Sequence, residues 1–173
     1  SRQTAEATAA HIEETVGYPC VVKPCSCGSS VGVSMAEDRE ELMQALTLAM
    51  QYEGDIIAER RIQGREVTVS VLGGRVLPAV EIVPHEGFYD YANKYQAGAV
   101  EELCPARIAL AEASALADAA RRGFDVLRLG GYARFDFILD KTGTAWCLEA
   151  NALPGITLTS LLPRAAAAIG MDY

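Results

Sequence analysis

Apolar residues in the first third of the chain recur at helical spacing in two segments that flank a short apolar strand. Residues 4–16 are rich in helix formers and end at Gly17, a typical C-terminal cap. A second helix is predicted after Asp38, which has Glu41 at the third helical position. Its predicted buried face consists of Leu42, Ala45, Leu46 and Ala49. Between the two helices, residues 20–23 form a predicted strand.

Strand patterns dominate the rest of the chain, with one further helix. The predicted strands are 55–59, 67–72, 76–83, 132–139 and 145–150, with a hairpin turn at Gly73-Gly74. Ala113, Leu116, Ala117, Ala120 and Phe124 recur at helical spacing and predict a helix over 109–124. Hairpins mixed with helices exclude a Rossmann series of βαβ units and predict an α+β fold. A change of pattern near Gln63-Gly64 divides the chain into predicted domains 1–63 and 64–173.

Composition narrows the range of partners. The chain has 173 residues, half of them apolar, and a formal net charge of -8. Such an acidic chain is not expected to bind nucleic acid or an anionic membrane, because both are bound by clustered Lys and Arg. Charged residues, Gly and Pro interrupt the apolar stretches, so no membrane span is predicted, and no secretory signal before Ser1 is expected. We therefore expect a cytoplasmic protein.

The five cysteines are scattered along the chain at positions 20, 25, 27, 104 and 147. An odd number without regular spacing does not suggest a disulfide framework. Cys25 and Cys27 are one residue apart, but no CxxC pair or nearby His completes a tetrahedral metal site. We interpret the cysteines as small buried or loop side chains.

Lys23 ends an apolar strand and precedes the Gly- and Ser-rich stretch 25–32. A fixed cation beside exposed backbone N–H groups suits phosphate oxygens. The Walker pattern is absent, because no Gly-Lys-Ser/Thr sequence opens a helix here. Phosphate binding and a simple turn between strands both remain open interpretations of this loop.

A second cluster lies on the last two predicted strands and contains Arg134, Asp136, Glu149 and Asn151. Side chains alternate along a strand, so Arg134 and Asp136 share one face, as do Glu149 and Asn151. A two-residue Thr142-Gly143 turn would place Asp136 opposite Glu149, but a bulge at this turn would change the register. Carboxylate and amide oxygens suit Mg²⁺, and the alternative is a solvated sheet face.

Residues 84–99 show no steady period, and their aromatic side chains alternate with polar groups. A nucleic-acid platform would need more than the one Lys in the Gly87 to Tyr95 stretch. We favour a lid that closes over a small substrate, with a tyrosine-rich packing loop as the alternative.

These segments together resemble the D-alanine-D-alanine ligase family of the ATP-grasp superfamily from about Gly17 to Tyr173. The shared motifs are Val-Val-Lys-Pro with Gly-Ser-Ser-Val-Gly, the 59–66 stretch, Phe-Tyr-Asp-Tyr-Ala-Asn-Lys-Tyr, Ala-Arg-Phe-Asp, and Leu-Glu-Ala-Asn-Ala-Leu-Pro-Gly. Several motifs occur across the superfamily, whereas the tyrosine loop is specific to this branch. The resemblance implies an ATP-grasp fold, with two small α+β lobes around an ATP cleft.

The resemblance also implies a role for each matched residue. Lys23 is expected to contact the ATP phosphates, with Ser29 and Ser30 in the loop that closes on the transferred phosphoryl group. Glu59, Arg60 and Ile62 are expected to line the adenine pocket, and Glu66 to hold the ribose. Lys94 is expected to reach the γ-phosphate, and Tyr95 to help close the site. The remaining expected roles are charge stabilisation by Arg134, binding of two Mg²⁺ ions (or Mn²⁺) by Asp136, Glu149 and Asn151, and binding of the second D-alanine by Gly155, Ser160 and Leu161.

The implied reaction converts D-alanine into an acylphosphate that a second D-alanine attacks, in the pathway to peptidoglycan. The full-length enzymes of the family are expected to be homodimers. The family also has an N-terminal domain and a further ATP-contacting Lys upstream of the one matched by Lys23. This sequence contains neither the domain nor the upstream Lys, so the chain is expected to be a fragment that is inactive alone. The alternatives are a D-lactate- or D-serine-joining ligase, an unrelated ATP-grasp ligase, and a non-catalytic nucleotide-binding remnant.

Overall fold

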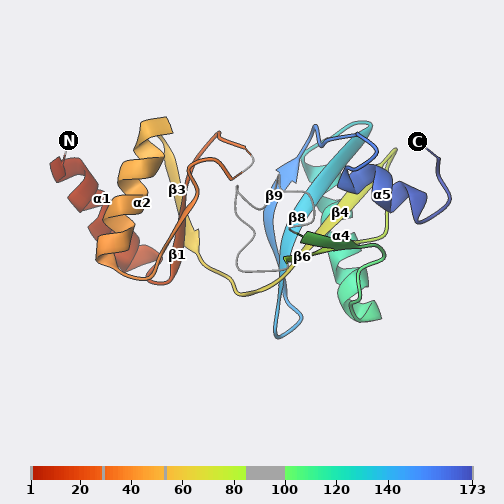
Figure 1. Ribbon diagram of the computed structural model, residues 1–173, viewed down its shortest axis with the longest axis horizontal. Coiled ribbons are helices and arrows are strands. Elements are labelled where there is room, and N and C mark those ends of the chain that lie inside the picture. The colour runs from red at the N-terminus through yellow and green to blue at the C-terminus, as the bar shows by residue number, and fades with distance from the viewer. Residues whose placement is uncertain (1, 29, 53, 85–99, 173) are drawn as a thin grey trace. The chain divides into compact units, whose positions relative to one another are not determined.

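The computed structural model describes residues 2–28, 30–52, 54–84 and 100–172 (Figure 1). The chain divides into two compact units, one that ends at Arg61 and another that begins at Ile62. Each unit has its own antiparallel sheet and its own apolar core. The predicted α+β class is therefore confirmed.

The first unit packs two helices against one face of a three-stranded sheet with the order β2-β1-β3 (Figure 1). Its elements are α1 (Arg2–Thr15), β1 (Cys20–Pro24), β2 (Ser34–Ala36), α2 (Arg39–Tyr52) and β3 (Ile56–Arg60). The predicted face of α2 is confirmed, because Leu42, Ala45, Leu46 and Ala49 are all buried in the core. Strand β2 was not predicted, since three residues are too few to show a period.

Both predicted helix caps of this unit are present. Gly17 has a φ of 73°, and its N–H donates to the carbonyl of Ile12 at 3.0 Å, which ends α1. At the start of α2, the Asp38 carboxylate accepts the backbone N–H of Glu41 at 3.0 Å. Gly17 therefore marks the end of α1, and Asp38 marks the start of α2. Strands β1 and β2 lie between these two caps.

The second unit is built on a six-stranded sheet with the order β7-β6-β4-β8-β9, in which β5 also pairs with β4. Its elements are β4 (Gly64–Leu72), β5 (Arg75–Val76), β6 (Val80–Pro84), β7 (Val100–Leu103), α4 (Leu110–Val126), β8 (Tyr132–Asp140), β9 (Ala145–Asn151) and α5 (Leu161–Ala167). The Gly73-Gly74 hairpin is confirmed by the pairing of Leu72 with Arg75. The single strand predicted over 76–83 is wrong, because Pro78 lacks the N–H needed to continue the ladder between β5 and β6.

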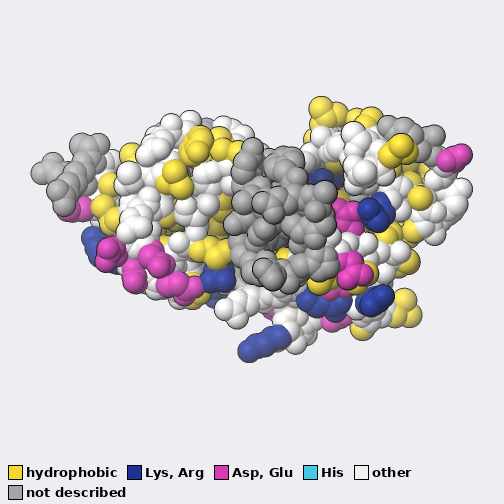
Figure 2. Space-filling model, in the orientation of Figure 1, with side chains coloured by type: hydrophobic (Ala, Val, Ile, Leu, Met, Phe, Trp, Pro, Cys, Tyr) yellow, Lys and Arg dark blue, Asp and Glu magenta, His cyan; other side chains and the backbone are white. Residues whose placement is uncertain are grey.

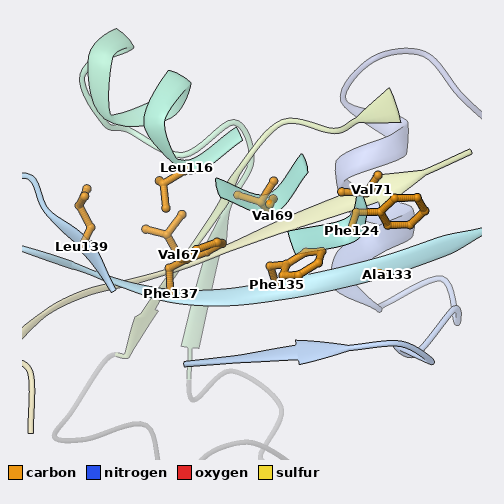
Figure 3. Close-up of a cluster of buried hydrophobic side chains, with 10 residues drawn as sticks. Val67, Val69, Val71, Leu116, Phe124, Ala133, Phe135, Phe137 and Leu139 are labelled. Carbon is orange, nitrogen blue, oxygen red and sulfur yellow. The ribbon is translucent and has the colours of Figure 1, made fainter. Parts of the chain in front are cut away.

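The core of this unit lies between α4 and one face of β4 and β8 (Figure 3). Along β8, buried and half-buried positions alternate without interruption. The buried set therefore points toward α4, and the side chains between them point to the opposite face. The largest fully buried side chains of this core are Phe135, Phe137, Leu116 and Leu139. This alternation leaves Arg134 and Asp136 on the face away from α4.

Helix α5 covers part of that opposite face. Leu162, Ala165 and Ala166 pack with Leu77 and Val80 in a smaller cluster, which Leu72 and Tyr132 extend. Leu72 and Tyr132 alternate with core positions along β4 and β8, so this cluster lies across the sheet from α4. The sequence did not predict α5.

Acidic and basic side chains are interspersed on the face of the molecule shown in Figure 2. Among the described residues, no helix has the length and apolar character needed to cross a bilayer.

Candidate active site

The four side chains of the predicted cluster lie on one face of the β8–β9 pair. Asp136 is directly opposite Glu149, and Arg134 is directly opposite Asn151. Directly opposed residues of an antiparallel pair point to the same face, so all four groups project from the face away from α4. The predicted juxtaposition is therefore confirmed by the strand register.

The strand register places Asp136 opposite Glu149 without a two-residue turn. A two-residue Thr142-Gly143 turn would pair Leu139 with Trp146, whereas Leu139 pairs with Ala145. A β-bulge between Asp136 and Phe137 then shifts the pairing back by one residue. Of the two turns that the sequence left open, the two-residue one is excluded, because a longer turn is closed by the N–H of Asp140 on the carbonyl of Thr144 at 3.0 Å, with Gly143 at a φ of 82°.

The Arg134 guanidinium donates two parallel hydrogen bonds to the Asp136 carboxylate. Nε donates to Oδ1 and Nη2 donates to Oδ2, both at 2.8 Å. The two side chains are only 14% and 13% exposed, so solvent screens this ion pair weakly. Such two-pronged pairs are stronger and more directional than single hydrogen bonds. The site thus holds one fixed cation beside its most enclosed carboxylate.

Asp136, Glu149 and Asn151 are suited to a hard divalent cation. In the described parts of the chain, no three His, Cys, Asp or Glu side chains are grouped as metal ligands. Two carboxylates and one amide would hold a Mg²⁺ ion through hard oxygen ligands and would leave room for phosphate oxygens and water. Glu149 is exposed and Asn151 is half-buried, so both are accessible from solvent. The chemistry of these donors fits the predicted metal.

Thr68 belongs to the same face but was not singled out from the sequence. It pairs directly with Asp136 across β4 and β8, and its residue exposure is 1%. Its buried hydroxyl has no hydrogen-bond partner within the described part of the chain. A buried hydroxyl without a hydrogen-bond partner lowers the stability of the fold. Thr68 therefore places an unsatisfied polar group beside the Asp136 carboxylate. Only the three-dimensional pairing of β4 with β8 could have identified it.

In the first unit, the predicted phosphate-binding Lys23 points away from the helical core. Lys23 alternates with the buried residues Cys20 and Val22 on β1. Its ammonium group donates to Glu59 on β3 at 2.8 Å, with side chains 23% and 36% exposed. The register opposes Val21 to Glu59, so Lys23 and Glu59 are diagonal neighbours on one face of the sheet. Lys23 and Glu59, which were both predicted to bind ATP, therefore form an ion pair with each other.

The Gly- and Ser-rich loop joins β1 to β2 as a long hairpin connection. Its base is closed by the pairing of Val22 with Ser34. Gly32 has a φ of 72°, and a Cβ atom there would lie 2.8 Å from the Pro24 ring and 2.9 Å from the Tyr52 ring. Ser30 also has a positive φ, of 61°. The loop therefore packs so tightly over Pro24 and Tyr52 that only glycine fits at position 32.

The remaining predicted site residues lie in separate places along the chain. Arg60 is exposed at the end of β3, Ile62 is half-buried at the start of the second unit, and Glu66 is half-buried on β4. Glu66 pairs with Ile138, so it shares the face that carries Asp136. Ser29, Lys94 and Tyr95 lie outside the described residues.

The segment predicted to bind the second substrate makes a tight local structure. Ser160 precedes α5, and its hydroxyl accepts the backbone N–H of Thr157 at 3.0 Å. A Cβ at Gly155 would lie 2.9 Å from the Ser160 Oγ, so glycine permits this close approach. Leu161 packs against the cluster around Leu77, so much of its side chain is already covered.

The fold is similar to those of solved ligase structures. A D-Ala:D-Ser ligase from Enterococcus faecalis, VanG, superposes with a TM-score of 0.86 at 32% identity, over 99% of this chain and 51% of that one. A D-alanine–D-alanine ligase from Bacillus anthracis superposes with a TM-score of 0.82 at 33% identity, over 95% and 53%. The class defined by this fold is the ATP-grasp ligases.

Sequence comparison narrows the class to one family. The family described as D-ala D-ala ligase C-terminus matches residues 1–173, and this chain belongs to it. A D-alanine–D-alanine ligase from Anaeromyxobacter sp. (strain Fw109-5) is 49% identical over 160 residues, which cover 91% of this chain and 51% of that protein. One from Methylacidiphilum infernorum is 46% identical over 155 residues, 90% and 51%. The chain spans about half the length of these relatives.

Proposed function

We propose that this chain supplies the ATP-binding and metal-binding half of a cytoplasmic enzyme that joins two D-alanine molecules for peptidoglycan. The observation that carries the proposal is the placement of Asp136 opposite Glu149, flanked by Arg134 and Asn151. The family match over residues 1–173 supports the same substrates. A structure of the Bacillus anthracis ligase complexed with ATP superposes with a TM-score of 0.79 at 29% identity and supports the nucleotide.

The described residues divide the work by charge. Asp136, Glu149 and Asn151 would hold Mg²⁺, with Mn²⁺ as an alternative. When bound, the ion supplies positive charge to the phosphate oxygens. Arg134 already lies beside Asp136 and would stabilise negative charge on the reacting carboxyl group as it becomes an acylphosphate and is then attacked. Lys23 would exchange its pair with Glu59 for ATP phosphate oxygens.

Other residues are proposed to position the two substrates. Residues 1–63 and 64–173 would form the two lobes of the nucleotide cleft, with a homodimer as the assembled enzyme. The residues proposed for ATP are Ser29, Ser30, Glu59, Arg60, Ile62, Glu66 and Lys94, with Tyr95 helping to close the site. Gly155, Ser160 and Leu161 would bind the second D-alanine. The tight contact of Gly155 with Ser160 supports a preorganised pocket for a small substrate.

ATP titrations of this chain test the proposal, with and without Mg²⁺, by calorimetry. We expect binding that requires Mg²⁺ and that weakens about tenfold or more in Asp136→Asn and in Glu149→Gln, because each loses an anionic ligand. Asp118→Asn is the matched control, since Asp118 is exposed on α4, which covers the other face of the sheet. Binding that ignores both Mg²⁺ and the two site variants would count against the assignment.

A second candidate is a ligase that joins D-alanine to D-serine. It is favoured by one observation, the TM-score of 0.86 with the D-Ala:D-Ser ligase VanG. Phosphate release and dipeptide analysis with D-alanine, alone or mixed with D-serine, separate the two specificities. Nucleotide binding without any phosphate release would instead support a non-catalytic nucleotide-binding role for this chain by itself.

A further inference from the structure

Two of the five cysteines lie together on the loop that leaves β1, and both side chains are exposed. Cys25 directly follows β1, and Cys27 comes two residues later. Cys20, by contrast, is buried and Cys104 is half-buried. Some of the cysteines are therefore buried, as expected, whereas Cys25 and Cys27 are loop residues that reagents in solution can reach.

Cys25 and Cys27 are separated by a single residue, in a part of the chain where the backbone bends. An extended chain separates residues i and i+2 by about 6.6–7.2 Å, whereas a disulfide needs Cα atoms about 4.4–6.8 Å apart. The chain bends at Cys25 and Ser26, and a bent backbone spans a shorter distance than an extended one. The N–H of Cys25 donates to the carbonyl of Asp55 at 3.0 Å, so one end is held. Gly28 follows Cys27 and gives the other end conformational freedom.

We propose that Cys25 and Cys27 form a dithiol site that reacts with small-molecule disulfides and that the closed ring weakens nucleotide binding. The second half of this statement rests on the proposed function. The loop that contains the pair begins two residues after Lys23 and is closed at its base by the pairing of Val22 with Ser34. A ring at its start redirects the backbone that leads to Gly28, whose carbonyl accepts the N–H of Val31 at 3.2 Å.

The chemistry balances without any further reactant. The thiolate of one cysteine attacks the small-molecule disulfide, forms a mixed disulfide and releases one small thiolate. The second cysteine then attacks the protein sulfur of that mixed disulfide, closes the protein disulfide and releases the second small thiolate. The two cysteine thiols lose two protons and two electrons in total, and the reagent is reduced to two small thiols.

Other thiols of the chain are less favoured partners for this reaction. Burial raises the pKa of Cys20 and of Cys104. Burial, together with the Asp136 and Glu149 carboxylates, raises the pKa of Cys147, although this residue is exposed overall. A raised pKa lowers the thiolate fraction and slows exchange at a given pH. Cys147 is nevertheless replaced in the test, because it is the remaining exposed cysteine.

The test uses the chromogenic disulfide dithiobis(nitrobenzoate) on the Cys147→Ser chain. We expect fast release of two nitrothiobenzoates with none retained, and a protein mass lower by two hydrogen atoms. Adding Cys25→Ser or Cys27→Ser should give release of one nitrothiobenzoate and retention of one. A parent chain that keeps an adduct on each cysteine, or that leaves both cysteines unmodified, would overturn the dithiol site.

The coupling to nucleotide is measured on the closed form. We expect ATP to bind about tenfold more weakly, which is the loss of one charge-assisted hydrogen bond, and a dithiol reductant to restore binding. The Cys25→Ser/Cys27→Ser/Cys147→Ser chain, treated with the same reagent, should keep its affinity. Ring closure with unchanged ATP binding would overturn the coupling. If the reduced chain does not bind ATP, the proposed function fails, and the thiol stoichiometry still decides the dithiol site.

Discussion

Asp136 faces Glu149 across β8 and β9, although the next pair toward the turn, Phe137 with Cys147, is out of step by one residue. The longer turn moves the pairing by one position, and the bulge at Leu148 moves it back. The two register shifts cancel at the pair Asp136 and Glu149. Without the bulge, the two acidic side chains would not be neighbours on one face.

The Arg134 guanidinium occupies both carboxylate oxygens of Asp136, so a cation that bound there would have to displace it. We expect Arg134→Met to bind Mn²⁺ in the absence of nucleotide about five- to tenfold more tightly, which corresponds to removal of a competing pair worth about 1–1.5 kcal/mol. Calorimetric Mn²⁺ titration measures this change. Arg121→Met is the matched control, because it removes an exposed pair with Asp125 on α4. Equal affinities in the two variants would contradict the competition.

Thr68 carries a buried hydroxyl without a partner in the described part of the chain. Replacing it with the isosteric valine should raise the free energy of unfolding of the ligand-free chain by about 1 kcal/mol, because an unsatisfied buried polar group is removed. Urea unfolding of the wild type and Thr68→Val provides the measurement. Thr144→Val, which removes an exposed hydroxyl from the turn, should give no such gain. A less stable Thr68→Val chain would mean that the hydroxyl has a partner.

Asp140 should stay ionised well below the pH at which an ordinary Asp titrates. Hydrogen bonds from Thr142 and then Trp146 lower its pKa. Because the folded pKa lies below the unfolded value of about 3.9, its contribution to stability is present above that pH and is lost as the pH falls through the folded pKa.

Trp146 reports this titration, because it is the only Trp and its indole N–H donates to Asp140 at 2.9 Å. Its emission should therefore remain constant down to about pH 4 and change only in stronger acid. In Asp140→Asn, the emission should differ at neutral pH and show no acid transition of this kind. If the emission of the wild type changed with a midpoint at the pKa of an ordinary Asp, these hydrogen bonds would not lower the pKa of Asp140.

Gly123 on α4 gives room to the Phe135 ring, since a Cβ atom at Gly123 would lie 2.6 Å from Phe135 Cε1. Gly123→Ala should lower the free energy of unfolding by about 1–3 kcal/mol through overpacking. Combined with Phe135→Leu, it should cost at least about 0.5 kcal/mol less than the sum of the single changes. Thermal unfolding of the four chains forms the cycle, and Gly130→Ala, which enters open space, is the control. Additive losses would argue against this contact.

Local periodicity was sufficient to predict elements that have one apolar face. The buried side chains of α2 and the alternation along β8 follow directly from residue spacing, because each element lies against a single core. The three-residue strand β2 and the strand β7, with Glu101 and Glu102 at its centre, have no such spacing. Helix α5 has Pro163 near its start, which a first turn tolerates but which obscured the helix in the sequence.

The candidate site was predictable in its residue types and not in its geometry. Spacing alone puts Arg134 with Asp136 on one face, and the structure adds the two hydrogen bonds between them. The opposition of Asp136 to Glu149 depended on a turn and a bulge that local sequence does not determine. Thr68 could not be identified at all, because its partner strand is distant along the chain. The proposed roles of Ser29, Lys94 and Tyr95 stay predictions.

The bulge beside Asp136 has a consequence for the register of this strand pair. Because the one-residue shift lies between the acidic face and the hairpin tip, the pairing of Asp136 with Glu149 has a different register from the pairing next to the turn. The exposed tip of the hairpin and the acidic pair beyond the bulge are therefore separate parts of one strand pair, each with its own register.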